Sequence, residues 1–122
     1  MGVKTVDELA AYQLSEAFKR EIYRLVRSFP AADRDLKFRD QLFEAASGPP
    51  SHIAEGFARN TPREFRRFLS YARGSLNEAL VRLRDGVDRG HFGDGACVDA
   101  KLLGGRALKA VAGLQKSLAP FL

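Results

Sequence analysis

Few side chains in this chain could take part in catalysis: two histidines, His52 and His91, and one cysteine, Cys97. Helical spacing places neither histidine beside a nucleophile and a carboxylate, as a hydrolytic triad requires. His52 stands three residues before Glu55, but a di-metal helical bundle needs two Glu-x-x-His pairs and further glutamates. The sequence therefore predicts no catalytic residue, no metal site and no cofactor.

One enzymatic alternative stays open. Arg84 and His91, with six residues between them, resemble the Arg-x4-6-His motif of a helical, HEPN-like ribonuclease family. In that family the arginine and the histidine handle the scissile phosphate. Gly90 precedes His91 here, so we expect the histidine in a loop between helices rather than on a helix.

Arginine accounts for most of the basic side chains. The formal charge is +5, from 20 basic and 15 acidic residues. The planar guanidinium fork suits phosphate and carboxylate groups. The charge therefore permits a nucleic-acid or acidic protein partner.

Apolar spacing predicts four helices and almost no strand. The first helix is expected from Thr5, where Glu8 completes a capping box, to the Phe29-Pro30 stop. Its inward stripe consists of Leu14, Phe18, Ile22, Leu25, Val26 and Phe29. The second helix is expected to begin between Asp33 and Leu36 and to carry Phe38, Leu42, Ala45 and Ala46 inward.

The segment Ser47-Gly48-Pro49-Pro50 predicts a kink or a short break in the second helix, because proline lacks an amide donor and clashes with the preceding turn. Ser51 could cap the resumed helix, which Gly56 or Asn60 would end. Gly56 is expected to permit close helix approach, and the pair Gly74-Ser75 to form a tight crossing point. A ligand or partner site is the alternative for both segments.

The third helix has the clearest signals: Thr61 as cap, Pro62 at the first position and Glu64 in a capping box. Its apolar face is expected to contain Phe65, Phe68, Leu69, Ala72, Leu76, Ala79, Leu80, Leu83 and Val87, with Gly90 and Gly93 ending the helix. The fourth helix is expected over 94–118, with Gly104-Gly105 at a close approach. Its inward residues would be Val98, Leu102, Leu103, Ala107, Val111, Leu114 and Leu118.

Long amphipathic helices with short connections predict an all-α, antiparallel up-down-up-down four-helix bundle. It would form a single domain over 1–122, with a proline kink in the second helix. No apolar run approaches the roughly 20 residues of a membrane span. The N-terminal residues resemble no secretory signal, and the lone Cys97 suits a reducing cytoplasm.

The segment Pro50-Ser51-His52-Ile53-Ala54-Glu55-Gly56-Phe57 with Arg59 resembles the central motif of a bacterial four-helix-bundle family. This family is named after proteins encoded in intervening sequences of 23S ribosomal RNA genes. The likeness extends to 17–23, Phe29-Pro30, Glu64-Phe65-x-x-Phe68-Leu69 and Gly74-Ser75-Leu76-x-Glu78. The family usually has asparagine where this chain has His52.

The resemblance implies a ring-shaped homopentamer without enzymatic activity. It also implies a fold shared with accessory proteins of diversity-generating retroelements, which bind a reverse transcriptase and nucleic acid. A homo-oligomer, an RNA or DNA partner and a reverse transcriptase or other protein partner are therefore expected.

One flank of the third helix is basic. At 3.6 residues per turn, Arg63, Arg66, Ser70, Arg73, Asn77 and Arg84 fall in one stripe, while Glu64, Glu78 and Asp85 fall on the other flank. Arg59 and Arg67 lie close to the same end of the helix. Such a row could contact successive phosphates. It could equally be a solvated flank, or form ion pairs between subunits.

The sequence thus favours a non-catalytic, self-associating bundle that binds nucleic acid through Arg59, Arg63, Arg66, Arg67, Arg73 and Arg84. A protein-only adaptor is the main alternative. Charge reversal at Arg66 and Arg73 is expected to weaken nucleic-acid retention.

Overall fold

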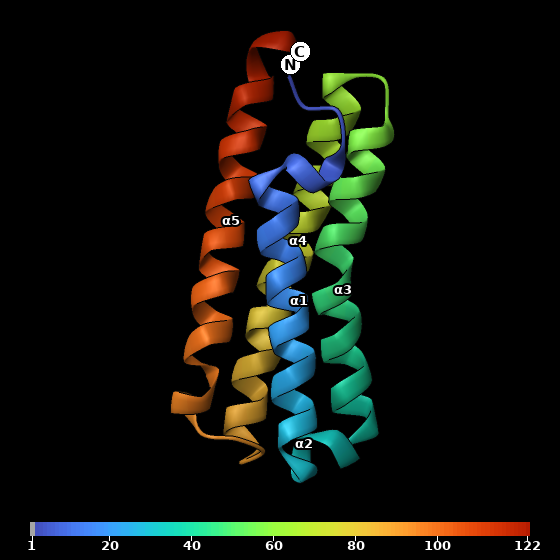
Figure 1. Cartoon of the computed structure of the whole chain (residues 1–122). Helices are drawn as coiled ribbons and strands as arrows, with labels where there is room; N and C mark the ends of the chain where they lie inside the picture. Colours follow the sequence, from blue (N-terminus) through green and yellow to red (C-terminus); the bar gives the residue numbers. More distant parts are fainter. Residues whose placement is uncertain (1) are drawn as a thin grey trace.

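Four long helices make up most of the protein. The computed structural model describes residues 2–122, and its long helices are α1 (Ala10–Ser28), α3 (Leu36–Ala58), α4 (Pro62–Asp88) and α5 (Val98–Leu118). The chain reverses direction at each connection, so that α1 and α4 run one way and α3 and α5 the other (Figure 1). The all-α antiparallel bundle predicted from the sequence is confirmed.

The N-terminal capping box is present, but it does not start the first long helix. The backbone N–H of Thr5 donates to Oε2 of Glu8 at 2.8 Å, and this box caps the one-turn 3-10 helix η1 (Val6–Glu8). Leu9 then adopts an extended backbone and its side chain is buried. The prediction of a helix from Thr5 is therefore wrong, because the chain bends at Leu9 to bring this side chain into the core.

Proline and aspartate set the next turn. The α1 helix ends at Ser28 because Phe29, which precedes Pro30, has the extended backbone that a following proline favours. Pro30 begins the short helix α2 (Pro30–Arg34), which the sequence reading did not include. Asp35 then caps α3, its Oδ1 accepting from the N–H of Phe38 at 3.3 Å. The start of the second long helix lies within the predicted range.

The two prolines of α3 do not break it. The helix is continuous from Leu36 to Ala58, so the predicted break is wrong and the predicted kink stays a prediction. Pro49 and Pro50 are both buried, and burial of their rings offsets the lost backbone hydrogen bonds. Ser51 consequently lies inside the helix, exposed to solvent, and does not act as a cap.

Glycines mark the closest contacts between helices, though not all where predicted. A Cβ added to Gly56 would lie 2.7 Å from Cβ of Phe68, and one at Gly104 would lie 2.9 Å from Cδ2 of Leu80. Both close approaches are confirmed. Of the predicted crossing pair Gly74-Ser75, only Ser75 takes part, since Gly74 has open space around it. A Cβ added to Gly48 of α3 would lie 2.7 Å from Oγ of Ser75, because helical register turns Ser75 inward and Gly74 outward.

The core follows the predicted stripes in three helices and follows the predicted stripe of the fourth helix only in part. Phe18, Ile22, Leu42, Leu69 and Leu76 are among its fully buried side chains. Val98 and Leu102, however, are 59% and 51% exposed, so their predicted inward position is wrong. Ala107, Val111 and Leu118 are buried as predicted, and the other buried positions of α5 are Ala100, Gly104 and Gln115.

The end of α4 has the geometry of a Schellman motif, formed around a left-handed glycine. Gly90 has φ 78. Its N–H donates to the carbonyl of Val87, and the N–H of His91 donates to the carbonyl of Gly86. A loop and the 3-10 helix η2 (Asp94–Cys97) lead into α5. Gly90 therefore ends the helix as predicted, and α5 begins a few residues later than expected.

Candidate nucleic-acid interface

The start of α4 is fixed by its cap. Oγ1 of Thr61 accepts from the backbone N–H of Glu64 at 3.2 Å, and Pro62 occupies the first helical position. The Glu64 side chain pairs with Arg67 at 3.3 Å. The first turns of α4 lie beside the last turns of α5, at the end of the bundle opposite α2 (Figure 1). Arginines at the beginning of α4 are therefore held next to the end of α5.

Four of the six predicted arginines line one surface hollow between these two helices. The hollow has a volume of about 350 Å³, and its lining residues include no carboxylate side chain. They are Arg63, Arg66, Arg67, Ser70, Arg73, Gln115 and Leu122. The structure thus gathers the N-terminal half of the predicted basic stripe into a concave, positively charged site.

Gln115 of α5 fixes Arg66 and Ser70 in place. Its Nε2 donates to the backbone carbonyl of Arg66 at 3.2 Å and to Oγ of Ser70 at 2.9 Å. In return, Nε of Arg66 donates to the backbone carbonyl of Gln115 at 3.2 Å. Sequence reasoning missed Gln115, although a glutamine on the stripe of Val111 and Leu118 is a signal that could have identified it.

The arginines of the hollow differ in how far their charge is neutralised. Arg67 donates from Nε to the hydroxyl of Tyr71 at 2.7 Å, and this hydrogen bond, assisted by the charge of Glu64, raises the pKa of Arg67. Arg63 and Arg73 are exposed. Within residues 2–122, neither of them has an acidic oxygen within the 4.0 Å of an ion pair. The hollow therefore has a net positive charge.

Arg59 and Arg84 lie outside the hollow. The guanidinium of Arg59 stacks on the ring of Phe68, 4.9 Å from its centroid, and pairs with Glu55 at 3.3 Å. Arg84 lines a separate hollow of about 470 Å³ between α4 and α5, together with Lys101 and two aspartates. The predicted stripe is thus divided into a basic site at one end and a mixed-charge site at the other.

The central motif is part of α3, and two of its residues line a polar groove between α3 and α4. Ser51 and His52 line this groove of about 490 Å³, together with Ser75 and Glu78. The His52 ring meets the Tyr71 ring edge-on, with 5.8 Å between centroids. Within the motif, Ile53 and Gly56 are buried, Ala54 is half-buried and Glu55 is exposed.

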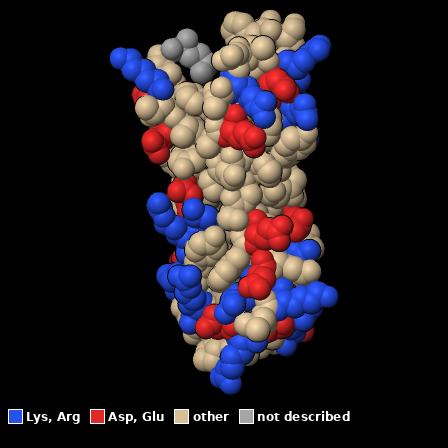
Figure 2. Space-filling model, turned by 90° about the vertical axis from the view of Figure 1, so that its right-hand side faces the viewer, with Lys and Arg blue, Asp and Glu red and all other residues tan. Residues whose placement is uncertain are grey.

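An uncharged surface band accompanies the motif. No residue from 45 to 54 of α3 is charged. Figure 2 views the molecule from the α3 side and shows a band at mid-height that is free of lysine, arginine, aspartate and glutamate, with charged side chains above and below it.

Comparison with known families agrees with the resemblance seen in the sequence. Residues 7–96 match the family described as 23S rRNA-intervening sequence protein. The chain belongs to this family. The match covers α1 to α4, whereas α5, with Gln115, lies beyond it. A search of curated proteins finds no match.

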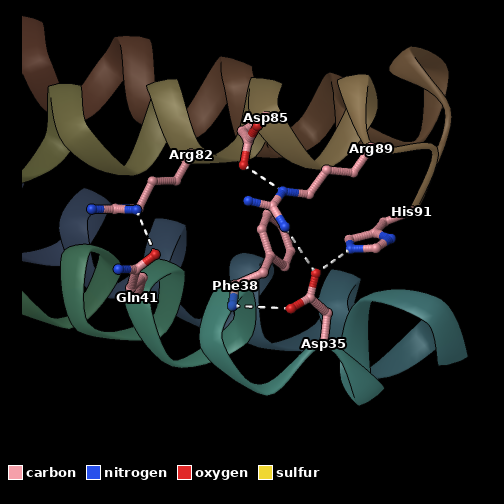
Figure 3. Close-up of polar contacts among 7 residues, drawn as sticks. All are labelled: Asp35, Phe38, Gln41, Arg82, Asp85, Arg89 and His91. Carbon is pink, nitrogen blue, oxygen red and sulfur yellow. Dashed lines mark hydrogen bonds and ion pairs between the residues drawn. The ribbon is translucent and has the colours of Figure 1, made fainter.

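In this family member, the acidic flank of α4 is neutralised within the helix. Glu78 pairs with Arg82 at 3.0 Å and Asp85 with Arg89 at 2.7 Å. Arg82 also donates to Oε1 of Gln41 in α3 at 2.9 Å (Figure 3). Arg82 of this flank therefore joins α4 to α3, whereas Arg63, Arg67 and Arg73 of the hollow are exposed.

The two residues of the ribonuclease alternative contact different helices. His91 lies in the loop after α4, as predicted, and its Nε2 is 2.8 Å from Oδ2 of Asp35, the residue that caps α3. Its ring also packs edge-on against Phe38 (Figure 3). Arg84, in contrast, lines the hollow toward α5. The arrangement gives His91 a contact that holds the α4 loop against α3.

Two further observations concern metal binding and membrane-spanning helices. Among residues 2–122, no three histidine, cysteine, aspartate or glutamate side chains gather closely enough to hold a metal ion. None of the helices described here combines the length and the apolar character needed to cross a membrane.

Acid should weaken the contact between Asp35 and the α4 loop. The hydrogen bond with His91 is the main cause that lowers the pKa of Asp35, with the Phe38 amide and the Arg89 charge contributing. Because the folded pKa is below the ordinary 3.8, this stabilisation is fully present above 3.8 and is lost as the pH falls through the folded value.

Asp35→Asn tests this pH dependence, because asparagine keeps the capping role and removes the charge. We expect the variant to melt at a lower temperature than the natural chain at neutral pH, and the difference to shrink toward about pH 2.5. Thermal melts followed by circular dichroism over this range are the measurement. A difference that stays constant with pH would contradict the assignment.

Proposed function

We propose that this protein is a non-catalytic, self-associating helical bundle that binds nucleic acid through Arg63, Arg66, Arg67 and Arg73. The observation that carries the proposal is the hollow lined by these four arginines and by no aspartate or glutamate side chain. Arginine forks match phosphate oxygens, and each phosphate that is neutralised releases bound counterions. Membership of the 23S rRNA-intervening sequence protein family is consistent with an RNA-related role.

The test uses Arg63 and Arg73, which are exposed and not ion-paired in the described chain. Replacing both with glutamine should leave the fold intact and weaken binding of single-stranded RNA about tenfold at low salt. The slope of log affinity against log salt should fall by about 1.4, since each single-strand contact contributes about 0.7. Fluorescence anisotropy at several salt concentrations measures both quantities.

A matched control is available at the opposite end of the bundle. Arg34→Gln with Lys37→Gln makes the same change in net charge at two exposed positions. If both double variants lose affinity equally, the binding reflects overall charge and the proposed interface is wrong. Arg66→Glu is a poorer test than the sequence suggested, because Arg66 also bonds to Gln115 in α5.

We propose that the protein self-associates, as a pentamer by resemblance to the family. Val81 of α4 and Val98 and Leu102 of α5 support this, because each is more than half exposed. Burial of these side chains between subunits would offset the cost of exposing them in one chain. A solution mass of five chains supports the proposal, and a monomer at micromolar concentration contradicts it.

The second candidate function is a protein-only adaptor, with a reverse transcriptase or another protein as partner. The uncharged band at 45–54 and the polar groove beside it favour this candidate. Nuclease treatment of a captured complex separates the two functions. An adaptor keeps its partner, whereas a protein held only through nucleic acid loses it.

We propose that the protein has no catalytic residues and acts in the cytoplasm, where a lone Cys97 would stay reduced. The ribonuclease candidate needs Arg84 and His91 to meet at one phosphate, but His91 contacts Asp35 at the start of α3 and Arg84 lines a hollow toward α5. RNA cleavage that His91→Ala abolishes would reverse this proposal.

A further inference from the structure

The arginines at the start of α4 surround a hollow instead of forming a straight row. Arg63, Arg66, Arg67 and Arg73 all line it, whereas Arg84 lies in a separate hollow further along α4. A volume of about 350 Å³ is within the range of small-molecule sites, and at about 30 Å³ per water it would hold roughly a dozen water molecules. A hollow of this size suits a single phosphate group with its attached nucleotide and does not fit the convex outer surface of a duplex.

The positive charge of the hollow favours a ligand that carries more than one negative charge. Arg63 and Arg73 are exposed and have no carboxylate partner in the described residues, and Arg66 bonds only to a neutral carbonyl. An internal phosphodiester carries a single negative charge. A terminal phosphomonoester carries about −1.5 to −2 at pH 7 and offers three acceptor oxygens. The hollow therefore matches a phosphate at a strand end better than one inside a strand.

The site is also fixed before any ligand arrives. Gln115 is 8% exposed and bonds to both Arg66 and Ser70, while Nε of Arg66 is held by the Gln115 carbonyl. This leaves the terminal nitrogens of Arg66 free to donate, with little side-chain freedom to lose on binding. A pair of helices joined by such reciprocal bonds positions the donors for a small anion.

We infer that the hollow binds the terminal phosphomonoester of an RNA strand. This inference rests on the proposed nucleic-acid binding and names the part of the strand that is recognised. The same chemistry is present at a 5′-phosphate and at a 3′-phosphate, so the experiment includes both ends. The second pKa of a phosphomonoester is about 6, so the preference for phosphorylated strands should decrease below that pH.

The experiment compares three forms of one single-stranded RNA oligonucleotide: 5′-phosphorylated, 3′-phosphorylated and with hydroxyls at both ends. Anisotropy titrations of the full chain at physiological salt should give about tenfold tighter binding for at least one phosphorylated form, as expected for added charge-assisted hydrogen bonds. The preference should disappear in Arg63→Gln with Arg73→Gln. It should persist in the charge-matched Arg34→Gln with Lys37→Gln.

The outcomes separate this inference from the proposed function. Equal affinity for all three oligonucleotides would overturn end recognition and leave nucleic-acid binding in place. No binding of any form would overturn both. A preference that survives Arg63→Gln with Arg73→Gln would also overturn the inference, since end recognition would then lie elsewhere on the protein.

Discussion

Replacing Phe18 with alanine is expected to lower the free energy of unfolding by about 3–5 kcal/mol. Phe18 lies in the middle of α1 and is completely buried. Its ring packs against α5, where Cε1 would lie 3.1 Å from a Cβ added to Gly104. Alanine would leave a cavity that the close contact between these helices cannot fill. The loss is large compared with the roughly 5–15 kcal/mol of a typical domain.

Urea denaturation measures this effect as a shift in midpoint with an unchanged slope. All samples need the same protein concentration, because self-association would couple unfolding to subunit dissociation. Phe18→Leu is the matched control and should cost much less, since it keeps most of the buried volume. If alanine at this position cost under about 1 kcal/mol, the ring could not occupy the core as described.

Two helix-interior glycines are expected to respond to alanine in opposite directions. Gly56→Ala should destabilise by about 1–3 kcal/mol, because the new methyl group would meet Cβ of Phe68 at 2.7 Å. That atom is attached directly to the α4 backbone, so the clash can be relieved only by moving the helices apart. Gly74→Ala should stabilise by about 1 kcal/mol, since Gly74 is exposed with open space around it.

The same denaturation experiment measures both glycine variants, and each serves as the control for the other. Equal stabilisation by the two substitutions would show that α3 and α4 approach less closely than described. Destabilisation by Gly74→Ala would have a different meaning: it would place Gly74 in a contact between subunits. That result would give an independent measurement of the self-association proposed above.

The helix signals near Thr61 and Gly90 were readable in the sequence because each acts within a few residues. A cap, a proline at the first helical position or a left-handed glycine needs no distant partner. The start of α1 was misplaced for the opposite reason. The capping box at Thr5 is real, but Leu9 bends the chain so that its side chain reaches a core built by other helices.

The inward face of α5 is predicted only in part by the sequence. Ala107, Val111 and Leu118 are buried as predicted, whereas Val98 and Leu102 are exposed and the small residues Ala100 and Gly104 are buried. The bundle buries the stripe of small residues because Gly104 permits close approach to Leu80 and Phe18. Packing against other helices also decides the structure at the prolines of α3. Their rings are buried by neighbouring helices, so the predicted break does not occur.

The sequence by itself determined four amphipathic helices, their main caps, the family motif and a basic flank on the third helix. These features follow from a period of 3.6 residues and from contacts within one or two turns. Tertiary structure alone decided that four arginines surround one hollow, that Arg84 is separate from them, and that Gln115 completes the site. Arg66 and Gln115 are 49 positions apart, and only the packing of α4 against α5 brings them together.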